Sequence, residues 1–135
     1  MESYNILAII VSALVSFAIG FLWFTILFRA PYMKGVDKTQ EELAKGPSMA
    51  LSFAIQIGAN LVLAFVLAWL INILQYETIS QAIQLGVLLW LGFVVAIIGP
   101  IYAFEAKSFQ FFLIIVFGYL ASILATALIL SVWKN

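Results

Sequence analysis

Four runs of apolar residues, at about 6–28, 47–74, 79–104 and 109–133, fill nearly the whole chain. Each run exceeds the roughly 20 residues that a helix needs to cross about 30 Å of hydrocarbon. None of the four contains Asp, Glu, Lys or Arg. Because hydrocarbon offers no water to backbone N–H and C=O groups, these runs are expected to be helical. The sequence therefore predicts an all-α, polytopic membrane protein, an antiparallel four-helix transmembrane bundle forming one domain, 1–135.

The composition excludes a water-soluble core. Of the 135 residues, 66% are hydrophobic and 9% are charged, against about 45–50% and 25% in soluble domains. The formal net charge is zero, so we expect the lipid bilayer and no nucleic acid as a partner. The chain has neither histidine nor cysteine and no carboxylate pair within a run. We therefore expect no catalytic residue, no cofactor and no metal site.

The basic residues predict the orientation of the helices. Five lie in the first and third loops, 29–46 and 105–108, namely Arg29, Lys34, Lys38, Lys45 and Lys107, and the opposite side has Lys134 alone. The positive-inside rule then predicts that these two loops are cytoplasmic and both termini lie outside, in an inner (cytoplasmic) membrane. The residues before the first run lack the positive region of a signal peptide, so we expect this run to be retained.

Local signals mark the helix ends. Thr39 followed by Glu42 is typical of a capping box that begins a short interfacial helix in the first loop. Pro47 then opens the second span, where its missing N–H costs nothing. Thr78 with Gln81 repeats the capping box at the third span. The second and third loops are tight turns, which predicts that consecutive helices are antiparallel neighbours.

Small or hydroxyl residues recur at about every fourth position in each span. They are Ala8, Ser12, Ser16 and Gly20; Ala50, Ala54 and Gly58; Gly92, Ala96 and Pro100; Gly118, Ser122 and Thr126. Membrane helices associate by close backbone approach over such residues. Either these stripes pack against each other within one chain or one of them faces another protomer. The pair Gly99-Pro100 predicts a kink in the third span.

A polar stripe on the second span is the first candidate site. It comprises Ser52, Gln56 and Asn60, and Trp90 lies at a similar depth on the third span. Since an unpaired amide in hydrocarbon costs several kcal/mol, we expect the Trp90 indole N–H to donate to the Asn60 carbonyl. The stripe is then either a bond between helices or the polar lining of a solute path.

An ion pair is the second candidate site. Arg29 ends the first span and Glu105 ends the third, on the same predicted side of the membrane. Arginine and a carboxylate can form bidentate hydrogen bonds, so this pair is expected to join the two helices at the inner rim. The alternative is that both side chains lie separately among lipid headgroups.

Several short segments resemble the family catalogued as domain of unknown function 1761. They are Gly20-Phe-Leu-Trp23-Phe24 through Phe28, Pro31-Tyr32-Met33-Lys34, Thr39 to Leu43, Trp90-Leu-Gly92-Phe93, Tyr102-Ala-Phe104-Glu105, Gly118-Tyr119 and Trp133. In that family a Gly-x-x-Trp-[Tyr/Phe] segment ends the first span. Members commonly have a histidine after the Gly-Tyr pair, where this chain has Leu120. The resemblance implies four spans and no settled activity, with Gly20, Trp23, Phe28, Trp90, Glu105, Gly118 and Tyr119 as motif positions.

The sequence leaves two main functional classes open. The first is a non-enzymatic membrane protein that transports or binds a small neutral or apolar solute. The alternative is an accessory or structural protein that packs against other membrane proteins, and a homo-oligomer is expected for either role. A third reading is a lipid-modifying enzyme that uses Glu105.

Overall fold

The computed structural model describes residues 4–133 as helices joined by short loops. The helices are α1 (Ile6–Leu22), α2 (Arg29–Val36), α3 (Gln40–Ala44), α4 (Met49–Ile73), α5 (Ile79–Leu89), α6 (Ala96–Phe104) and α7 (Phe109–Val132). Two π-helical segments, Trp23–Leu27 and Trp90–Val95, continue α1 and join α5 to α6. Four continuous helices result that are long and apolar enough to cross a membrane: Ile6–Leu27, Met49–Ile73, Ile79–Phe104 and Phe109–Val132. The predicted all-α fold with four spanning helices is confirmed.

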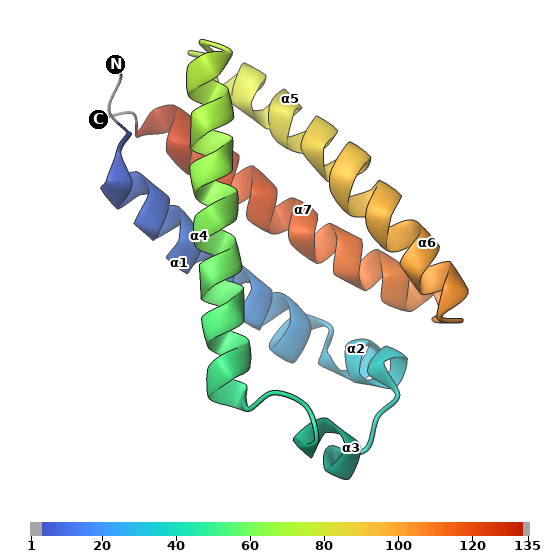
Figure 1. Ribbon diagram of the computed structural model, residues 1–135. Coiled ribbons are helices and arrows are strands. Elements are labelled where there is room, and N and C mark those ends of the chain that lie inside the picture. The colour runs from blue at the N-terminus through green and yellow to red at the C-terminus, as the bar shows by residue number, and fades with distance from the viewer. Residues whose placement is uncertain (1–3, 134–135) are drawn as a thin grey trace.

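Helix α7 lies at the centre of the structure (Figure 1). It packs along α1 on one side and along α5 on another, and α4 packs against α1. The core near the free ends of α1 and α7 consists of small and aliphatic residues of α1, α4, α5 and α7, among them Ala8, Ala64, Ala82 and Ala127. These four alanines come from four different helices, and their small side chains allow the backbones to lie close together.

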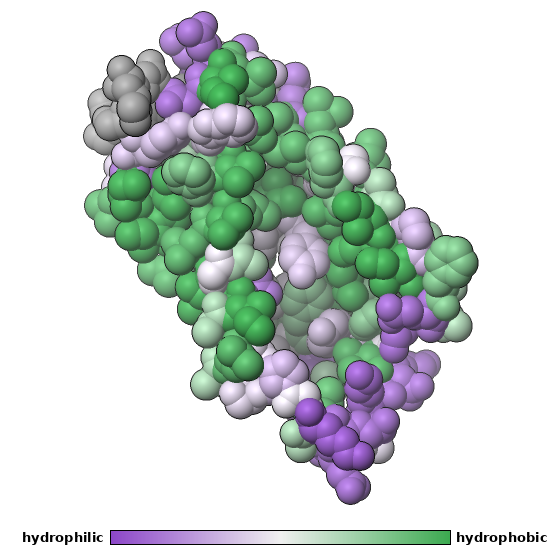
Figure 2. Space-filling model, in the orientation of Figure 1, coloured by the Kyte–Doolittle hydropathy of each residue, from purple (hydrophilic) through white to green (hydrophobic). Residues whose placement is uncertain are grey.

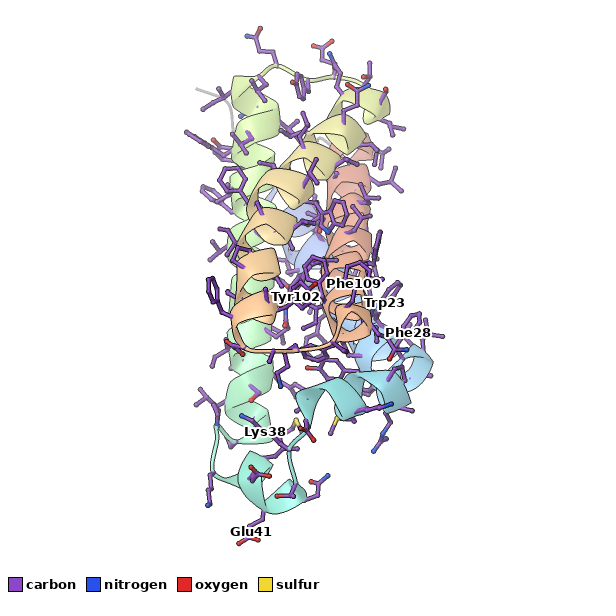
Figure 3. The ribbon with its side chains drawn as sticks, turned by 90° about the vertical axis from the view of Figure 1, so that its right-hand side faces the viewer. Trp23, Phe28, Lys38, Glu41, Tyr102 and Phe109 are labelled. Atoms are coloured by element: carbon purple, nitrogen blue, oxygen red, sulfur yellow. The ribbon has the colours of Figure 1, made fainter. Side chains whose placement is uncertain are left out.

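The two ends of the molecule differ in what they carry. The first and last described residues and the 74–78 turn lie at one end, which we call the turn end (Figure 1). Helices α2 and α3 and the 105–108 turn lie at the other end, which we call the loop end, and Lys38 and Glu41 extend from it (Figure 3). Hydrophilic residues gather at both ends, with a hydrophobic band between them (Figure 2). Lys134, the single basic residue expected opposite the loops, lies outside the described residues.

Two helix N-termini are capped as the sequence predicts, and a third is not. Both capping boxes form: the Thr39 and Thr78 side chains accept from the backbone N–H of Glu42 and Gln81, whose side chains bond back to the cap residues. The Pro47 prediction is wrong, because α4 begins two residues later and Ser48 is its cap. The sequence also missed α2, which occupies part of the loop where one short helix was expected.

Asn5 joins the start of α1 to the end of α7. Its side-chain oxygen accepts from the N–H of Ala8 at the start of α1, and its Nδ2 donates to the carbonyl of Trp133, 3.1 Å away. One amide therefore caps α1 and satisfies a carbonyl just beyond α7.

Consecutive helices are not all neighbours, and this prediction is wrong for one pair. Helices α4 and α5 meet at the 74–78 turn and then diverge, so that α4 and α6 stand well apart at the loop end (Figure 1). We call α4 one arm and the continuous α5–α6 helix the other arm. The α4 arm packs against α1, whereas α5 packs against α7. A tight turn fixes the direction of the next helix but not its crossing angle, which the contacts with α1 and α7 determine.

Ala106 offers a test of the turn between α6 and α7. Its φ of 56° is left-handed, a conformation that costs a residue with a side chain roughly 1–2 kcal/mol. We expect Ala106→Gly to raise the free energy of unfolding by about 0.5–1 kcal/mol, measured as the thermal midpoint in detergent. Ala103→Gly, within α6, is the control and should lower it by about 1 kcal/mol. A drop for both variants would contradict the strained turn.

Candidate functional site

A cleft separates α4 from α5 and α6 over the middle of α7. One part of it is a cavity of about 190 Å³ whose lining is entirely apolar. Leu63, Val66 and Leu67 of α4, Leu89, Phe93 and Val94 of the opposite arm and Ile123 of α7 form this lining. The hollow is visible in Figure 2, with weakly polar atoms over the middle of α7 at its floor.

The polar stripe of α4 divides between two surroundings. Gln56 lies four residues after Ser52 and seven residues before Leu63, which lines the cavity, so helical periodicity places both on the face of α4 that Leu63 presents, nearer the loop end. Both are exposed. Asn60 is instead buried against α1, where its Nδ2 donates to the Ala13 carbonyl at 3.3 Å. The stripe is therefore a helix–helix bond at Asn60 and a cleft surface at the other two residues.

Gln56 and Asn60 are linked to each other. Gln56 Nε2 donates to Asn60 Oδ1 at 2.9 Å, one turn along α4. This bond satisfies the Asn60 oxygen and leaves the Gln56 carbonyl oxygen without a hydrogen bond from residues 4–133. Gln56 thus keeps an acceptor at the cleft.

Trp90 does not bond to Asn60, and that prediction is wrong. Its indole N–H donates to the Val116 carbonyl of α7, and its ring lies 5.4 Å from that of Phe117. Trp90 faces α7 at the start of a π-helical segment, whereas Asn60 faces α1 on the other arm. Trp90 therefore fixes the arm that forms one wall of the cleft.

Trp23 makes the matching contact from α1. Its Nε1 donates to the Ile114 carbonyl at 2.9 Å, and its ring lies 4.8 Å from that of Phe28, beside α7 (Figure 3). Ile114 and Val116 are about 200° apart around α7, so the two indoles approach α7 from opposite sides. Each tryptophan begins a π-helical segment, and both hold α7 between them.

Gly118 makes room for the Trp23 contact. A Cβ at this position would lie 2.9 Å from Trp23 Cδ1 and 2.9 Å from Phe24 Cζ. The Gly20 position is different, because no atom lies within 4 Å of a Cβ built there. Of the family-motif glycines, Gly118 has a packing role and Gly20 has open space.

Hydroxyl groups join α1 to α7 beyond this contact. Ser16 and Thr126 are hydrogen-bonded at 2.9 Å, and Thr126 Oγ1 donates to the Ser122 carbonyl at 2.9 Å. Ser12, one turn from Ser16, is fully buried, and its Oγ has no partner among the described residues. The serine and threonine positions of two stripes thus meet within one chain.

The structure does not form the predicted ion pair of Arg29 with Glu105. Both side chains are exposed, and no ion pair within 4.0 Å is present among residues 4–133. Lys107 makes the connection at this end, because its Nζ donates to the Gly35 and Val36 carbonyls at 3.1 and 3.3 Å. A lysine on the last carbonyls of α2 is favourable. This contact could not be predicted, since α2 itself was not expected.

Tyr119 lies on the cleft side of α7. It is one turn before Ile123 on the same face and is 36% exposed. Its hydroxyl forms no hydrogen bond within the described part of the chain. Tyr32 of α2 is near it: burial, and secondly the neighbouring Tyr119 hydroxyl, raise the pKa of Tyr32 above its usual value of 10.0. Two phenols therefore lie between the loop end and the cleft.

A second, larger cavity of about 600 Å³ opens at the turn end. It lies between the start of α1 and the ends of α4 and α7, and Tyr4, Asn72, Gln75 and Trp133 are among its lining. Among the described residues that line it, Glu77 alone carries a charge. Tyrosine and tryptophan at this level are typical of a membrane interface.

The comparison with known families shows to which family the chain belongs. The sequence model of the family described as Protein of unknown function (DUF1761) matches residues 7–131. The chain belongs to this family. The matched region contains both tryptophans that hold α7, both π-helical segments and the whole cleft. No curated protein and no solved structure matches the chain.

The Trp23–Gly118 contact predicts the effect of adding one methyl group. We expect Gly118→Ala to lower the free energy of unfolding by about 1–3 kcal/mol, because Trp23 and Phe24 must move. Gly58→Ala is the matched control, since no atom lies within 4 Å of its Cβ. Thermal unfolding in detergent measures both. Equal midpoints for the two variants would mean that α7 is not held in this way.

Proposed function

We propose that the protein is a non-enzymatic membrane protein that binds or transports a small neutral or apolar solute in the cleft between α4 and the α5–α6 arm. The observation that supports this most directly is the apolar cavity between the two arms, with the exposed residues Ser52 and Gln56 nearer the loop end of α4. Binding sites for small molecules are mostly apolar, with a few polar groups that fix orientation. Ser52 and Gln56 supply such groups.

The cleft is also open to the side. Because α4 and α5 are joined at the turn end and diverge toward the loop end (Figure 1), a solute dissolved in the bilayer reaches the cavity without crossing the protein. None of the four spans contains a charged residue, so coupling to protons or ions at membrane depth is not part of the proposal. Binding with passive exchange is the simplest activity for such a site.

Cysteine labelling tests whether the loop-end part of the cleft is hydrated. The chain has no native cysteine. In vesicles, we expect Gln56→Cys to react with a water-soluble maleimide at least about tenfold faster than Ala54→Cys, since a thiol in an apolar environment does not ionise. Ala54 is the matched control, because it is exposed at nearly the same depth but about 200° away around α4.

The same experiment separates the alternatives. Asn60→Cys should stay unreactive, as Asn60 is buried against α1. If Gln56→Cys is as slow as Ala54→Cys, the cleft is filled and dry, and the solute proposal fails. That result would favour a helix of another protein in the cleft.

The alternative role, as an accessory protein or homo-oligomer, has one observation in its favour. Gly58, Gly92 and Gly99 have no atom within 4 Å of a built Cβ. These glycines therefore do not serve packing within the chain, unlike Gly118. Close approach of helices from another chain would use such positions.

We further propose an inner-membrane orientation with the loop end in the cytoplasm, from the excess of basic residues there. In intact cells, an impermeant maleimide should label Glu77→Cys at the turn end and leave Lys38→Cys at the loop end unlabelled until the cells are opened. The reverse pattern would invert the orientation. Equal labelling of both positions in intact cells would indicate a mixed topology.

A further inference from the structure

We infer that the cleft takes an uncharged amphiphile with one hydrocarbon chain and a hydroxyl group, held with its hydroxyl toward the loop end. This inference rests on the proposed function and names the class of solute. It is carried by the order of apolar and polar groups along two helices that border the cleft.

The hydrocarbon chain is expected at the turn-end part of the cleft. The cavity there is lined by Leu63 and Leu67 of α4, Phe93 of the opposite arm and Ile123 of α7, with no polar surface. A polar group in this cavity would lose its hydrogen bonds to water without replacement. Only a hydrocarbon segment matches this lining.

The hydroxyl is expected one or two turns nearer the loop end. Helices α4 and α7 both run from the loop end to the turn end (Figure 1), so Gln56 precedes Leu63 and Tyr119 precedes Ile123 in the same direction. The Tyr119 hydroxyl and the Gln56 carbonyl oxygen are a donor and an acceptor that residues 4–133 leave unbonded. A hydroxyl both accepts and donates, and so complements the two.

The absence of charged residues from the spans indicates that the solute is uncharged. Because the four apolar runs contain no charged residue, a carboxylate or ammonium group at the depth of Tyr119 would find no counterion on the spans that border the cleft. An unpaired charge in the membrane interior is costly. The solute is therefore neutral where it contacts Tyr119 and Gln56.

Photolabelling in nanodiscs of phosphatidylcholine tests this assignment. The probe is a long-chain alcohol with a diazirine at mid-chain. Its comparators are the alkane of equal length and the corresponding carboxylate. We expect saturable labelling by the alcohol at the apolar lining, read by peptide mass spectrometry at Leu63, Phe93 and Val94. Labelling by the alkane and the carboxylate should saturate at about 3- to 10-fold higher concentration, the loss expected for a hydrogen bond.

Tyr119→Phe gives the residue-level test. This variant removes only the hydroxyl, and the half-saturating concentration of the alcohol should rise about 3- to 10-fold, while that of the alkane stays unchanged. Tyr4→Phe is the control and should alter neither, because Tyr4 lies at the turn end against Phe65. Thermal midpoints of both variants establish that they fold.

Failure of the inference and failure of the proposed function give different results. If alcohol and alkane label the cleft equally and Tyr119→Phe has no effect, the cleft binds chains only, and the hydroxyl assignment is wrong. Equal saturation by the carboxylate would overturn the neutral headgroup. If no probe labels the cleft saturably, or if the lining crosslinks to a second copy of the chain, the proposed function itself fails.

Discussion

The close contact of α1 with α7 is the interaction on which the rest of the structure depends. In hydrocarbon no hydrophobic force joins two apolar helices, so they need short backbone distances and hydrogen bonds. Because Gly118 has no side chain, Trp23 of α1 can approach α7 closely, and its indole N–H donates to an α7 carbonyl. The hydrogen bond between Ser16 and Thr126 joins the same two helices nearer the turn end. The other two long helices pack against this pair, α4 against α1 and α5 against α7. The cleft is the space that remains between α4 and the α5–α6 arm.

The fold was largely predictable from the sequence because the bilayer permits few alternatives. Runs without a charge must be helical, and the caps at Thr39 and Thr78 depend only on residues three positions away. Helix α2 was missed because Pro31 and Gly35 weaken any helical signal. It is held instead by distant contacts, Lys107 on its last carbonyls and Phe111 against Gly35.

The site was less predictable, for a reason that Asn60 and Trp90 show. Depth along a span follows from residue number, and the prediction used it to place Asn60 and Trp90 at similar levels, but a hydrogen bond also depends on the direction each side chain faces. Trp90 faces α7, where its indole donates to the Val116 carbonyl, whereas Asn60 faces α1. No local pattern gives the direction in which a residue of a uniformly apolar span faces, so the partner of Trp90 could not be read from the sequence.

The π-helical segments also connect the two tryptophan contacts with α7 to the proposed function. Such segments are frequent at functional sites, and here the second one, Trp90–Val95, contributes Phe93 and Val94 to the cleft while its first residue bonds to α7. The same turn of backbone therefore fixes the arm and shapes the cavity wall. The α5–α6 arm is thus held to α7 by the Trp90 bond, as α4 is held to α1 by Asn60, and the cavity lies between these two anchored walls.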